Sequence, residues 1–438
     1  MPPAPVSPAA ERLYARDRVV AGVEKLRFFP LALESGQGSW LVEAGGRRLL
    51  DLSATWTACG LGHGHPAVRE ALLRAASAPP GAGALSAVHE DAVALAEDLL
   101  DLTPGSGDRR VYFGHAGSDA NDVAIRSAVH ATGRPTVLAF EHSYHGGIGI
   151  AMKASGVHVD AGSVARDQHV RFTPYPDPYR APERYEDVLA QLEEALAGGD
   201  VACLLVEPIL SDGGLVVPPD GFLAEVAARC SAAGTLLVCD EVKVGLGRPG
   251  TWHAFEHDGI TPDIVTFGKS LGAGVPISAA VGPAGVLDEP AASALLTQAG
   301  NPYSTAVARA VLATMKAEGL VERAADAGDR LREGLRQATE HLDVVGDVRG
   351  RGLAVGVDLV TDRGNRDRAP DLAARAVYRV WELGGVVFYV GGNVLEVTPP
   401  LVITDAEVDR AVELLAQGIQ EAADGKVSDA QIAPYAGW

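Results

Sequence analysis

The chain has 438 residues, of which 47% are hydrophobic and 21% are charged, a composition typical of soluble α/β proteins. Its net charge of −20 argues against binding of nucleic acid, whose phosphates it would repel, and would favour cationic ligands. No apolar run of about 18 residues predicts a membrane span, the N-terminus lacks a signal-peptide pattern, and the cysteines lack metal-ligand spacing. We therefore expect a cytoplasmic protein with no metal site and no contact with nucleic acid or membrane.

The first two thirds of the chain predict a large α/β domain preceded by a short N-terminal segment. Residues 1–66 contain hairpin-like pieces, and we expect this segment to join a smaller domain formed by the end of the chain. Over residues 67–305, helical patterns alternate with short apolar runs near 110–113, 136–140, 201–206, 235–239, 264–267 and 279–282. This alternation predicts a mostly parallel, doubly wound sheet.

Residues 306–438 predict the smaller domain, of α+β type. The pattern indicates helices over 306–325 and 329–342, a sheet near 352–359 and 386–397, and a final helix from about Asp405. We expect this domain to pack with the N-terminal segment.

Two charged residues come just after predicted strands, Asp240 after residues 235–239 and Lys269 after residues 264–267. Ligands of open α/β sheets bind beyond the carboxyl ends of the strands. A lysine there is able to form a Schiff base, and an aspartate is able to pair with a protonated pyridine nitrogen. These are the groups that pyridoxal 5'-phosphate chemistry needs most. The alternatives are a turn cap for Asp240 and a solvated loop lysine for Lys269.

A glycine-rich turn follows the first strand of the large domain and leads into a helix at Gly117-Ser118. The N-terminus of a helix offers unpaired N–H groups and a partial positive charge, which suit a phosphate group. The alternative is an ordinary helix start capped by Ser118 or Asp119. Tyr144, after the next strand, is placed to stack on a flat pyridine ring, with a surface aromatic as its alternative.

The order of these motifs resembles the class III aminotransferases of pyridoxal-phosphate fold type I, and the resemblance covers most of the chain. It implies a homodimer with shared active sites and a small-molecule substrate. The implied roles are phosphate binding for Gly117 and Ser118, stacking on the ring for Tyr144, pairing with the pyridine nitrogen for Asp240, packing beneath the ring for Val242, holding the aldehyde for Lys269, and reaching the neighbouring subunit's phosphate for Thr297.

Three positions depart from the pattern of this family, and all three bear on the substrate. Glu396 stands where many members carry an arginine that binds a substrate carboxylate, and Asp212 takes the place of the glutamate that otherwise pairs with that arginine. Lys243 replaces a usual glutamine near the ring hydroxyl. Asp212 and Glu396 together would repel a carboxylate, so the usual clamp is missing unless Arg351 or Arg248 serves instead.

Longer strings narrow the resemblance to a subfamily, the α-amino-ε-caprolactam racemases and related amino acid amide racemases. The strings are Lys25–Leu31, Tyr175–Arg180, Ser211–Gly214 with Pro218–Phe222, Asp240–Gly245 and the terminal Ala436–Trp438. The substrates of this subfamily carry an amide carbonyl and no free carboxylate, which agrees with the missing arginine.

The resemblance implies racemisation at Cα without a keto acid. The substrate amine displaces Lys269 from the cofactor, and the freed amine acts as a base on one face of Cα. Asp212 is the candidate acid or base on the other face, with Lys243 tuning its charge. The alternative role for Asp212 is an electrostatic filter against carboxylates.

Substrate contacts are expected from Trp56, Tyr144 and Glu396, with Trp56 packing against a lactam ring; its alternative is a core tryptophan. Two rival functions stay open. One is an aminotransferase for an amine or amino sugar, which would require an amino acceptor. The other is an idle relative used as a binding module, which predicts loss of Lys269 or Asp240, yet both residues are present.

Overall fold

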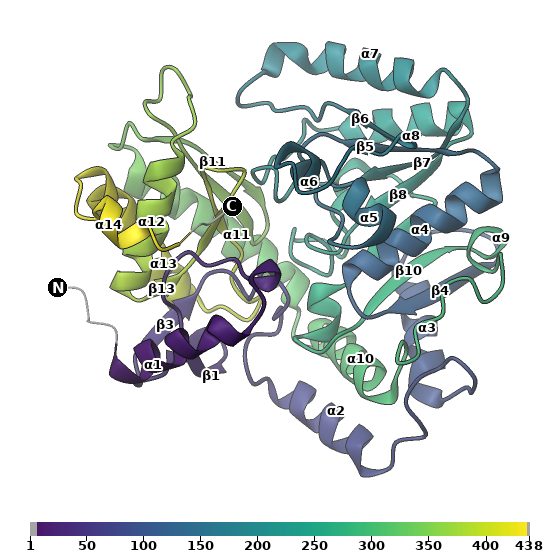
Figure 1. Ribbon diagram of the computed structural model, residues 1–438, viewed down its shortest axis with the longest axis horizontal. Helices are drawn as coiled ribbons and strands as arrows, with labels where there is room; N and C mark the ends of the chain where they lie inside the picture. Colours follow the sequence, from purple (N-terminus) through teal and green to yellow (C-terminus); the bar gives the residue numbers. More distant parts are fainter. Residues whose placement is uncertain (1–6, 436–438) are drawn as a thin grey trace.

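The computed structural model describes residues 7–435, so the terminal string Ala436–Trp438 lies outside the described residues. Its largest element is a seven-stranded sheet (Figure 1). In spatial order the strands are β4 (Arg109–Gly114), β10 (Ser278–Pro283), β9 (Ile264–Phe267), β8 (Leu236–Asp240), β7 (Val201–Val206), β5 (Thr136–Phe140) and β6 (Val170–Thr173). Only β10 runs antiparallel to its neighbours, which confirms the predicted mostly parallel sheet. Strand β6 was not predicted.

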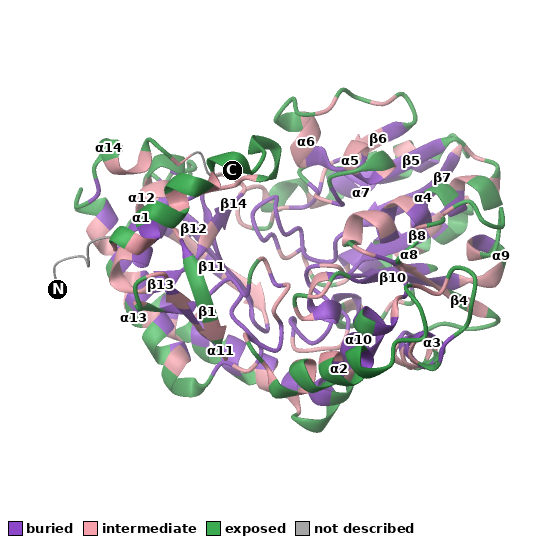
Figure 2. Ribbon diagram, turned by 60° about the horizontal axis from the view of Figure 1, so that its bottom comes forward, coloured by how far each residue is buried: buried purple, intermediate pink, exposed green. Residues whose placement is uncertain are grey.

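Strands β7 and β5 are buried throughout and mostly apolar, because helices cover both faces of the sheet (Figure 2). Alternate strand residues point to opposite faces, so Val137 and Leu205 pack with Ala124 of α4, whereas Leu138 and Leu204 pack with helices on the other side. The helices of this part are α2 (Pro66–Ser77), α3 (Glu90–Leu102), α4 (Gly117–Thr132), α5 (Gly149–Lys153), α6 (Gly156–Asp160), α7 (Tyr185–Leu196), α8 (Phe222–Ala233), α9 (Ala284–Leu287) and α10 (Pro302–Ala317).

The two ends of the chain lie together, on the left in Figure 1, and form two further four-stranded sheets. One joins β1 (Leu33–Gln37), β2 (Trp40–Glu43), β3 (Arg48–Asp51) and β13 (Gly385–Val386); the other joins β11 (Val345–Arg351), β12 (Ala354–Leu359), β15 (Val394–Val397) and β14 (Phe388–Val390). Strand β13 pairs in parallel with β3, so the N-terminal segment and the C-terminal part share a sheet. The domain boundaries at residues 66 and 305 stay predictions.

The remaining helices are α1 (Pro8–Arg16), α11 (Leu320–Thr339), α12 (Pro370–Leu383), α13 (Asp405–Ala423) and α14 (Asp429–Ile432). Helix α13 begins at Asp405 as predicted, because Thr404 and Glu407 form a reciprocal capping box. The predicted helix break at residues 326–328 was wrong. The chain turns instead at Gly319, whose φ is +61°, and Gly328 lies inside α11, where a Cβ would meet the carbonyl oxygen of Gly352 at 2.0 Å.

Residues 54–57 form a left-handed turn that contains no glycine. Their φ angles are +47°, +54°, +56° and +68°, and the turn closes with hydrogen bonds from the Thr57 N–H to the Ser53 carbonyl and from the Cys59 N–H to the Ala54 carbonyl, both 2.9 Å. The left-handed conformation costs about 1–2 kcal/mol for each such residue. Buried Asp51 offsets part of that cost by accepting hydrogen bonds from the N–H groups of Ser53 and Ala54, at 2.9 and 3.0 Å.

None of the helices in residues 7–435 has the length and apolar character needed to cross a bilayer. Within the same residues, no group of three or more His, Cys, Asp or Glu side chains is placed to hold a metal ion.

Candidate active site

A cavity of about 510 Å³ lies beyond the carboxyl ends of the strands of the large sheet, a volume usual for small-molecule sites. It brings together most of the residues that the sequence singled out. Its lining includes Gly117, Ser118, Tyr144, Asp212, Asp240, Val242, Lys243 and Lys269, together with Asn121, His145, Glu207 and the segment 274–277.

One end of the cavity is the start of helix α4. Asp119 caps the preceding turn, because its carboxylate accepts from the N–H groups of His115 and Ala116 at 2.7 and 3.1 Å. Ser118 is therefore left at the cavity, where its Oγ accepts from the Gly147 N–H at 3.1 Å. Gly117 is closely packed there, since a Cβ at that position would lie 2.5 Å from Val242 Cγ1. This end presents open N–H groups of a 16-residue helix to a ligand.

Asp240 is buried at the end of β8 and holds the centre of a hydrogen-bond network. Its Oδ2 accepts from Asn121 Nδ2 at 2.7 Å and lies 2.8 Å from His145 Nδ1, while its Oδ1 accepts from the Val242 N–H at 3.0 Å. Asn121 is itself fixed by Thr266, whose hydroxyl donates to Asn121 Oδ1 at 2.7 Å. Three partners therefore fix the orientation of the carboxylate, and it keeps acceptor capacity toward the cavity.

Sequence reasoning assigned no role to Asn121 or His145, although both lie inside motifs that it quoted. The available signal is helical spacing for Asn121, which lies one turn after Gly117 on α4, and adjacency for His145, which follows Tyr144. Only the fold shows that both side chains point to Asp240.

Lys269 follows β9 and opens a short 3₁₀ turn, with a φ of +41°. Burial lowers the pKa of its amine from the ordinary value, and the nearby positive charge of Lys243 adds to this effect. The next residue, Ser270, donates its hydroxyl to the Thr57 carbonyl at 2.6 Å, which ties this turn to the left-handed turn of residues 54–57. Tyr144 lines the same cavity, and its backbone N–H donates to Glu207 Oε2 at 2.9 Å.

Three buried charges from three separate segments lie together at the other end of the cavity. Asp212 and Lys243 line the cavity, whereas Glu396, a predicted substrate contact, lies outside the lining and contacts Lys243. Lys243 Nζ donates to Asp212 Oδ1 at 2.8 Å, and Glu396 Oε1 lies at the same distance from it as an ion-pair partner. Burial acts to lower the pKa of Lys243, but Asp212 and Glu396 outweigh it and raise that pKa above its usual range. Burial also raises the pKa of Glu396, against the effect of Lys243. The cluster therefore has no positive charge left for a substrate carboxylate.

Two further predicted contact residues lie outside the cavity lining. Trp56 lies behind the charge cluster, with Lys243 Nζ 5.2 Å from its ring centroid and Phe388 stacked on it at 4.8 Å. Thr297 lies on an exposed loop.

Both arginines considered above as a possible clamp for a substrate carboxylate are engaged elsewhere. Arg248 is buried and donates to the carbonyl groups of Leu353 and Pro399, each at 3.0 Å. Arg351 pairs with exposed Asp220 at 2.8 Å. No arginine is among the described residues that line the cavity.

Known proteins resemble this chain over nearly its whole length. The model of aminotransferase class III matches residues 21–419. This chain belongs to the class III aminotransferase family. The leucine/methionine racemase of Thermococcus litoralis is 34% identical, covering 96% of this chain and 98% of the relative. The alanine/serine racemase of Pyrococcus horikoshii is also 34% identical, with coverages of 97% and 93%.

Solved structures of the family share the fold of this class III protein. An (S)-enantioselective ω-transaminase from Thermomicrobium roseum matches it with a TM-score of 0.86 at 29% identity, covering 95% of this chain and 99% of the other. The predicted fold type I is thereby confirmed, and the protein is a pyridoxal-phosphate-dependent enzyme, a racemase or an aminotransferase.

The cavity of this class III enzyme fits pyridoxal 5'-phosphate. The crowded Gly117 and the capped turn of α4 leave an anion seat without side-chain obstruction at one end. Asp240 offers a fixed, buried carboxylate for a protonated ring nitrogen, and Lys269 offers an amine of lowered pKa for an aldehyde. We propose that Gly117, Ser118 and Asp240 hold the cofactor, with Lys269 as its point of attachment.

Proposed function

We propose that this enzyme racemises substrates at Cα, and that its substrates are α-amino-ε-caprolactam or related amino acid amides. The observation that carries the proposal is the charge cluster at the substrate end, where Asp212 and Glu396 flank Lys243. A free carboxylate would meet the Asp212 carboxylate and an amine that two buried acids already engage, whereas an amide carbonyl carries no net charge. The two racemase relatives, which by name act on amino acids, support the reaction type.

The residues divide the proposed reaction between two proton carriers. When bound, pyridoxal 5'-phosphate supplies an aldehyde for the substrate amine and a ring that takes up electrons from the Cα–H bond. Lys269 Nζ, whose pKa is lowered, takes or returns the Cα proton on one face. Asp212 carries the proton of the other face, and Lys243 holds the Asp212 carboxylate in place at 2.8 Å. Asp240 would keep the ring nitrogen protonated, and Tyr144 and Val242, which line the same cavity, would pack against the ring.

We also propose a homodimer with shared active sites, in which Thr297 reaches the phosphate of the neighbouring subunit. Thr297 lies on an exposed loop. Large apolar side chains are also exposed nearby in the sequence and on α2, among them Leu295 (58% exposed) and Leu73 (66% exposed), and exposed apolar side chains of this kind favour a subunit interface. Light scattering of the purified enzyme tests the dimer. Mixing subunits that carry Thr297→Ala with subunits that carry Lys269→Ala tests the sharing, because only mixed dimers would then regain one intact site.

The experiment that tests the function is incubation with L-α-amino-ε-caprolactam in heavy water without any keto acid. We expect the D-lactam with one deuterium at Cα, detected by chiral chromatography with mass spectrometry. Parallel reactions with leucinamide and with leucine separate the substrate classes. Faster inversion of leucine than of either carboxylate-free compound would overturn the amide proposal while keeping the racemase.

The second candidate is an aminotransferase for an amine or amino sugar. The net charge of −20 and the acidic cluster favour a cationic amine, and the family contains ω-transaminases of the same fold. This function predicts no exchange at Cα in the heavy-water experiment until an amino acceptor is added. Amine transfer that begins only with the acceptor would replace the racemase proposal with this one.

A further inference from the structure

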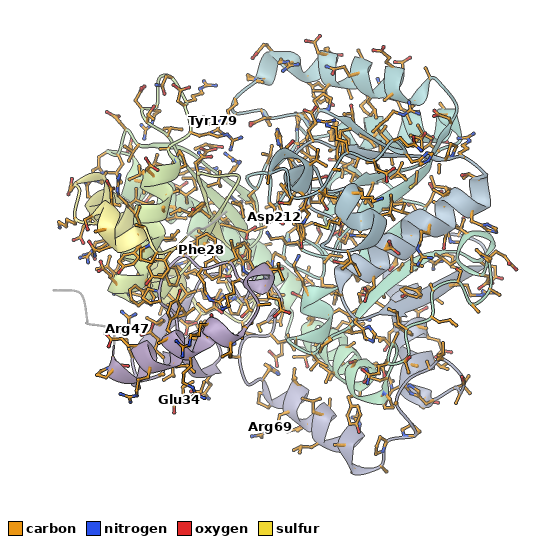
Figure 3. The ribbon with its side chains drawn as sticks, in the orientation of Figure 1. Phe28, Glu34, Arg47, Arg69, Tyr179 and Asp212 are labelled. Atoms are coloured by element: carbon orange, nitrogen blue, oxygen red, sulfur yellow. The ribbon has the colours of Figure 1, made fainter. Side chains whose placement is uncertain are left out.

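Asp212 lies on a short loop that leaves the large sheet after β7 and faces the C-terminal part of the molecule (Figure 3). Leu210 and Val216 close the loop by exchanging backbone hydrogen bonds at 2.9 and 3.0 Å. The loop bends through Gly214 and Leu215, whose φ angles are +120° and +46°. A leucine in the left-handed region costs on the order of 1–2 kcal/mol, so outside contacts must hold this conformation.

Those contacts come from the second four-stranded sheet. Arg349 of β11 reaches over the loop, where its Nη2 donates to the Gly214 carbonyl at 2.6 Å and its Nε donates to the Leu215 carbonyl at 2.9 Å. The Gly391 N–H donates to the Asp212 carbonyl at 2.9 Å. One planar guanidinium therefore fixes two successive peptide groups beside Asp212 through two nitrogens held in a rigid fork, a geometry that a lysine ammonium lacks.

Arg349 is in turn fixed by a buried carboxylate. Asp358 of β12 has no exposed surface and accepts from Arg349 Nη1 at 2.9 Å. Arg180, which precedes α7 in the large-sheet part, donates to both oxygens of Asp358 at 2.6 and 2.7 Å. Asn393 Nδ2 adds a fourth bond at 2.6 Å. The string Tyr175–Arg180, which no cofactor contact explains, thus supplies an anchor between the two parts of the molecule.

We propose that Arg349, held by Asp358 and Arg180, is a positioning residue that fixes the Asp212 carboxylate for proton transfer at Cα. The inference rests on the proposed racemisation and adds a determinant that touches neither cofactor nor substrate. Lys269 has no hydrogen bond to this network, so loss of Arg349 separates the two proton carriers. A displacement of about 1 Å at a reacting group costs on the order of 100-fold in rate.

The test compares Arg349→Gln with Arg351→Gln in the loaded enzyme. The two arginines share strand β11 and are similarly shielded, at 11% and 14% exposure, but Arg351 pairs with Asp220 at the surface. Each lactam enantiomer is incubated in heavy water, and deuterium uptake with retention is measured separately from inversion. We expect Arg349→Gln to slow inversion about 100-fold, while the enantiomer whose hydrogen faces Lys269 still exchanges with retention within a few-fold of the parent rate.

A purely structural role for Arg349 would lower exchange and inversion by the same factor, and that result would overturn the proposal. Inversion at the parent rate in Arg349→Gln would overturn it as well. Failure of the proposed function is a different result, because the unmutated enzyme itself would then show no inversion. In that case Asp212 is not a proton carrier, and the positioning role of Arg349 is wrong together with the proposed racemisation.

Hydrogen–deuterium exchange of the backbone gives a second readout that needs no turnover. In Arg349→Gln, the peptide that spans residues 211–216 is expected to exchange several-fold faster than in Arg351→Gln, with other peptides unchanged. Should Arg349→Gln fail to fold, Arg349→Lys keeps the charge beside Asp358 but loses the two-carbonyl clamp. The same separation of inversion from exchange is expected in that variant, and equal losses of both would count against the positioning role.

Discussion

The two ends of the active cavity are built in different ways. The cofactor end uses residues that follow strands β4, β8 and β9 of one sheet, and its main groups are Ser118, Asp240 and Lys269. The substrate end combines Asp212 after β7, Lys243 after β8 and Glu396 on β15, which belongs to another sheet. The first end is fixed by a single layer of secondary structure, whereas the second exists only where two parts of the chain meet.

This difference explains why the chemistry of the two ends is separable. The carboxyl ends of parallel strands make a rigid platform that holds one cofactor. The groups at the substrate end come from distant segments, so we expect substitutions there to leave the strand ends that hold the cofactor undisturbed. Glu396, which the resemblance places where other members of the family carry an arginine, is expected to be a change of this second kind. The following predictions test whether the two ends respond independently.

The largest effect is expected from Lys269→Ala, which removes the attachment point of the cofactor and one proton carrier together. Loss of a positioned base alone costs up to about 10⁴-fold, so we expect racemisation to fall by at least that factor. Borohydride reduction followed by peptide mass spectrometry should find cofactor on Lys269 of the parent and none in the variant. Lys153→Ala, which breaks a partly exposed pair with Asp167 away from the cavity, serves as control and should behave as the parent.

Asp212→Asn comes next and acts on the substrate end alone. The amide keeps the size of the side chain but neither gains nor loses a proton near neutral pH, so inversion should fall roughly 10²–10⁴-fold. Deuterium exchange with retention through Lys269 should continue, and cofactor binding should be unchanged by absorbance titration. Asp220→Asn is the control. Retained inversion in both directions would remove Asp212 as a proton carrier and leave it as a charge filter.

Gly117→Ala tests the cofactor end alone. The added Cβ would lie 2.5 Å from Val242 Cγ1, and overpacking of this kind costs about 1–3 kcal/mol, or roughly 5- to 140-fold in cofactor affinity. Equilibrium titration with pyridoxal 5'-phosphate measures it, and the double variant with Val242→Ala should recover most of the loss. At Gly147 a Cβ meets only Tyr144 Oη at 3.9 Å, so Gly147→Ala is the matched control. Equal losses at both glycines would contradict the close-packing argument.

The smallest effect on turnover, and a clear one on stability, is expected from His63→Gln. His63 Nε2 lies 2.7 Å from Asp51 Oδ2, and although burial opposes it, this partner raises the pKa of His63 to about 9. A raised folded-state pKa means that the added stability is complete below about pH 6.5 and is lost as the pH rises through 9. The variant should therefore be less stable by up to about 3 kcal/mol at pH 6 and equal to the parent at pH 10.

Urea unfolding at the two pH values measures this difference. His142→Gln is the control, because His142 is 59% exposed and its pair with Asp160 is screened by water. A stability difference that is the same at both pH values would show that His63 acts by packing and not by charge.

The sequence predicted the cofactor end more fully than the substrate end, and the reason is physical. The short apolar runs before Asp240 and Lys269 predict two strands, and they also predict that both residues lie at the carboxyl edge of the sheet. The capping turn at Gly117 is equally local. Helix boundaries failed where a contact from far away decided them, as at Gly328, which lies in α11 because the backbone of Gly352 passes close by.

The hydrogen-bond network of Arg349, which fixes the loop at the substrate end, leaves no local pattern in the sequence. Arg349 and Asp358 are nine residues apart on neighbouring strands, and Arg180 is far earlier in the chain, so no spacing rule links them. The resemblance to a racemase subfamily pointed to Asp212 and Lys243 as a functional pair. It did not indicate that Lys243 also pairs with Glu396, because Glu396 lies on β15 of another sheet and only the folded structure shows the contact.

The left-handed turn of residues 54–57 bears on the order in which a newly synthesised chain becomes an enzyme. In a free chain its residues Ala-Thr-Trp-Thr favour other conformations, so the turn needs hydrogen-bond partners from elsewhere in the chain to form. One of them, the Ser270 hydroxyl on the Thr57 carbonyl, adjoins Lys269 and leaves the ribosome more than two hundred residues later. We therefore expect the turn that carries Trp56 and the turn that carries Lys269 to become ordered together, late in the synthesis of the chain.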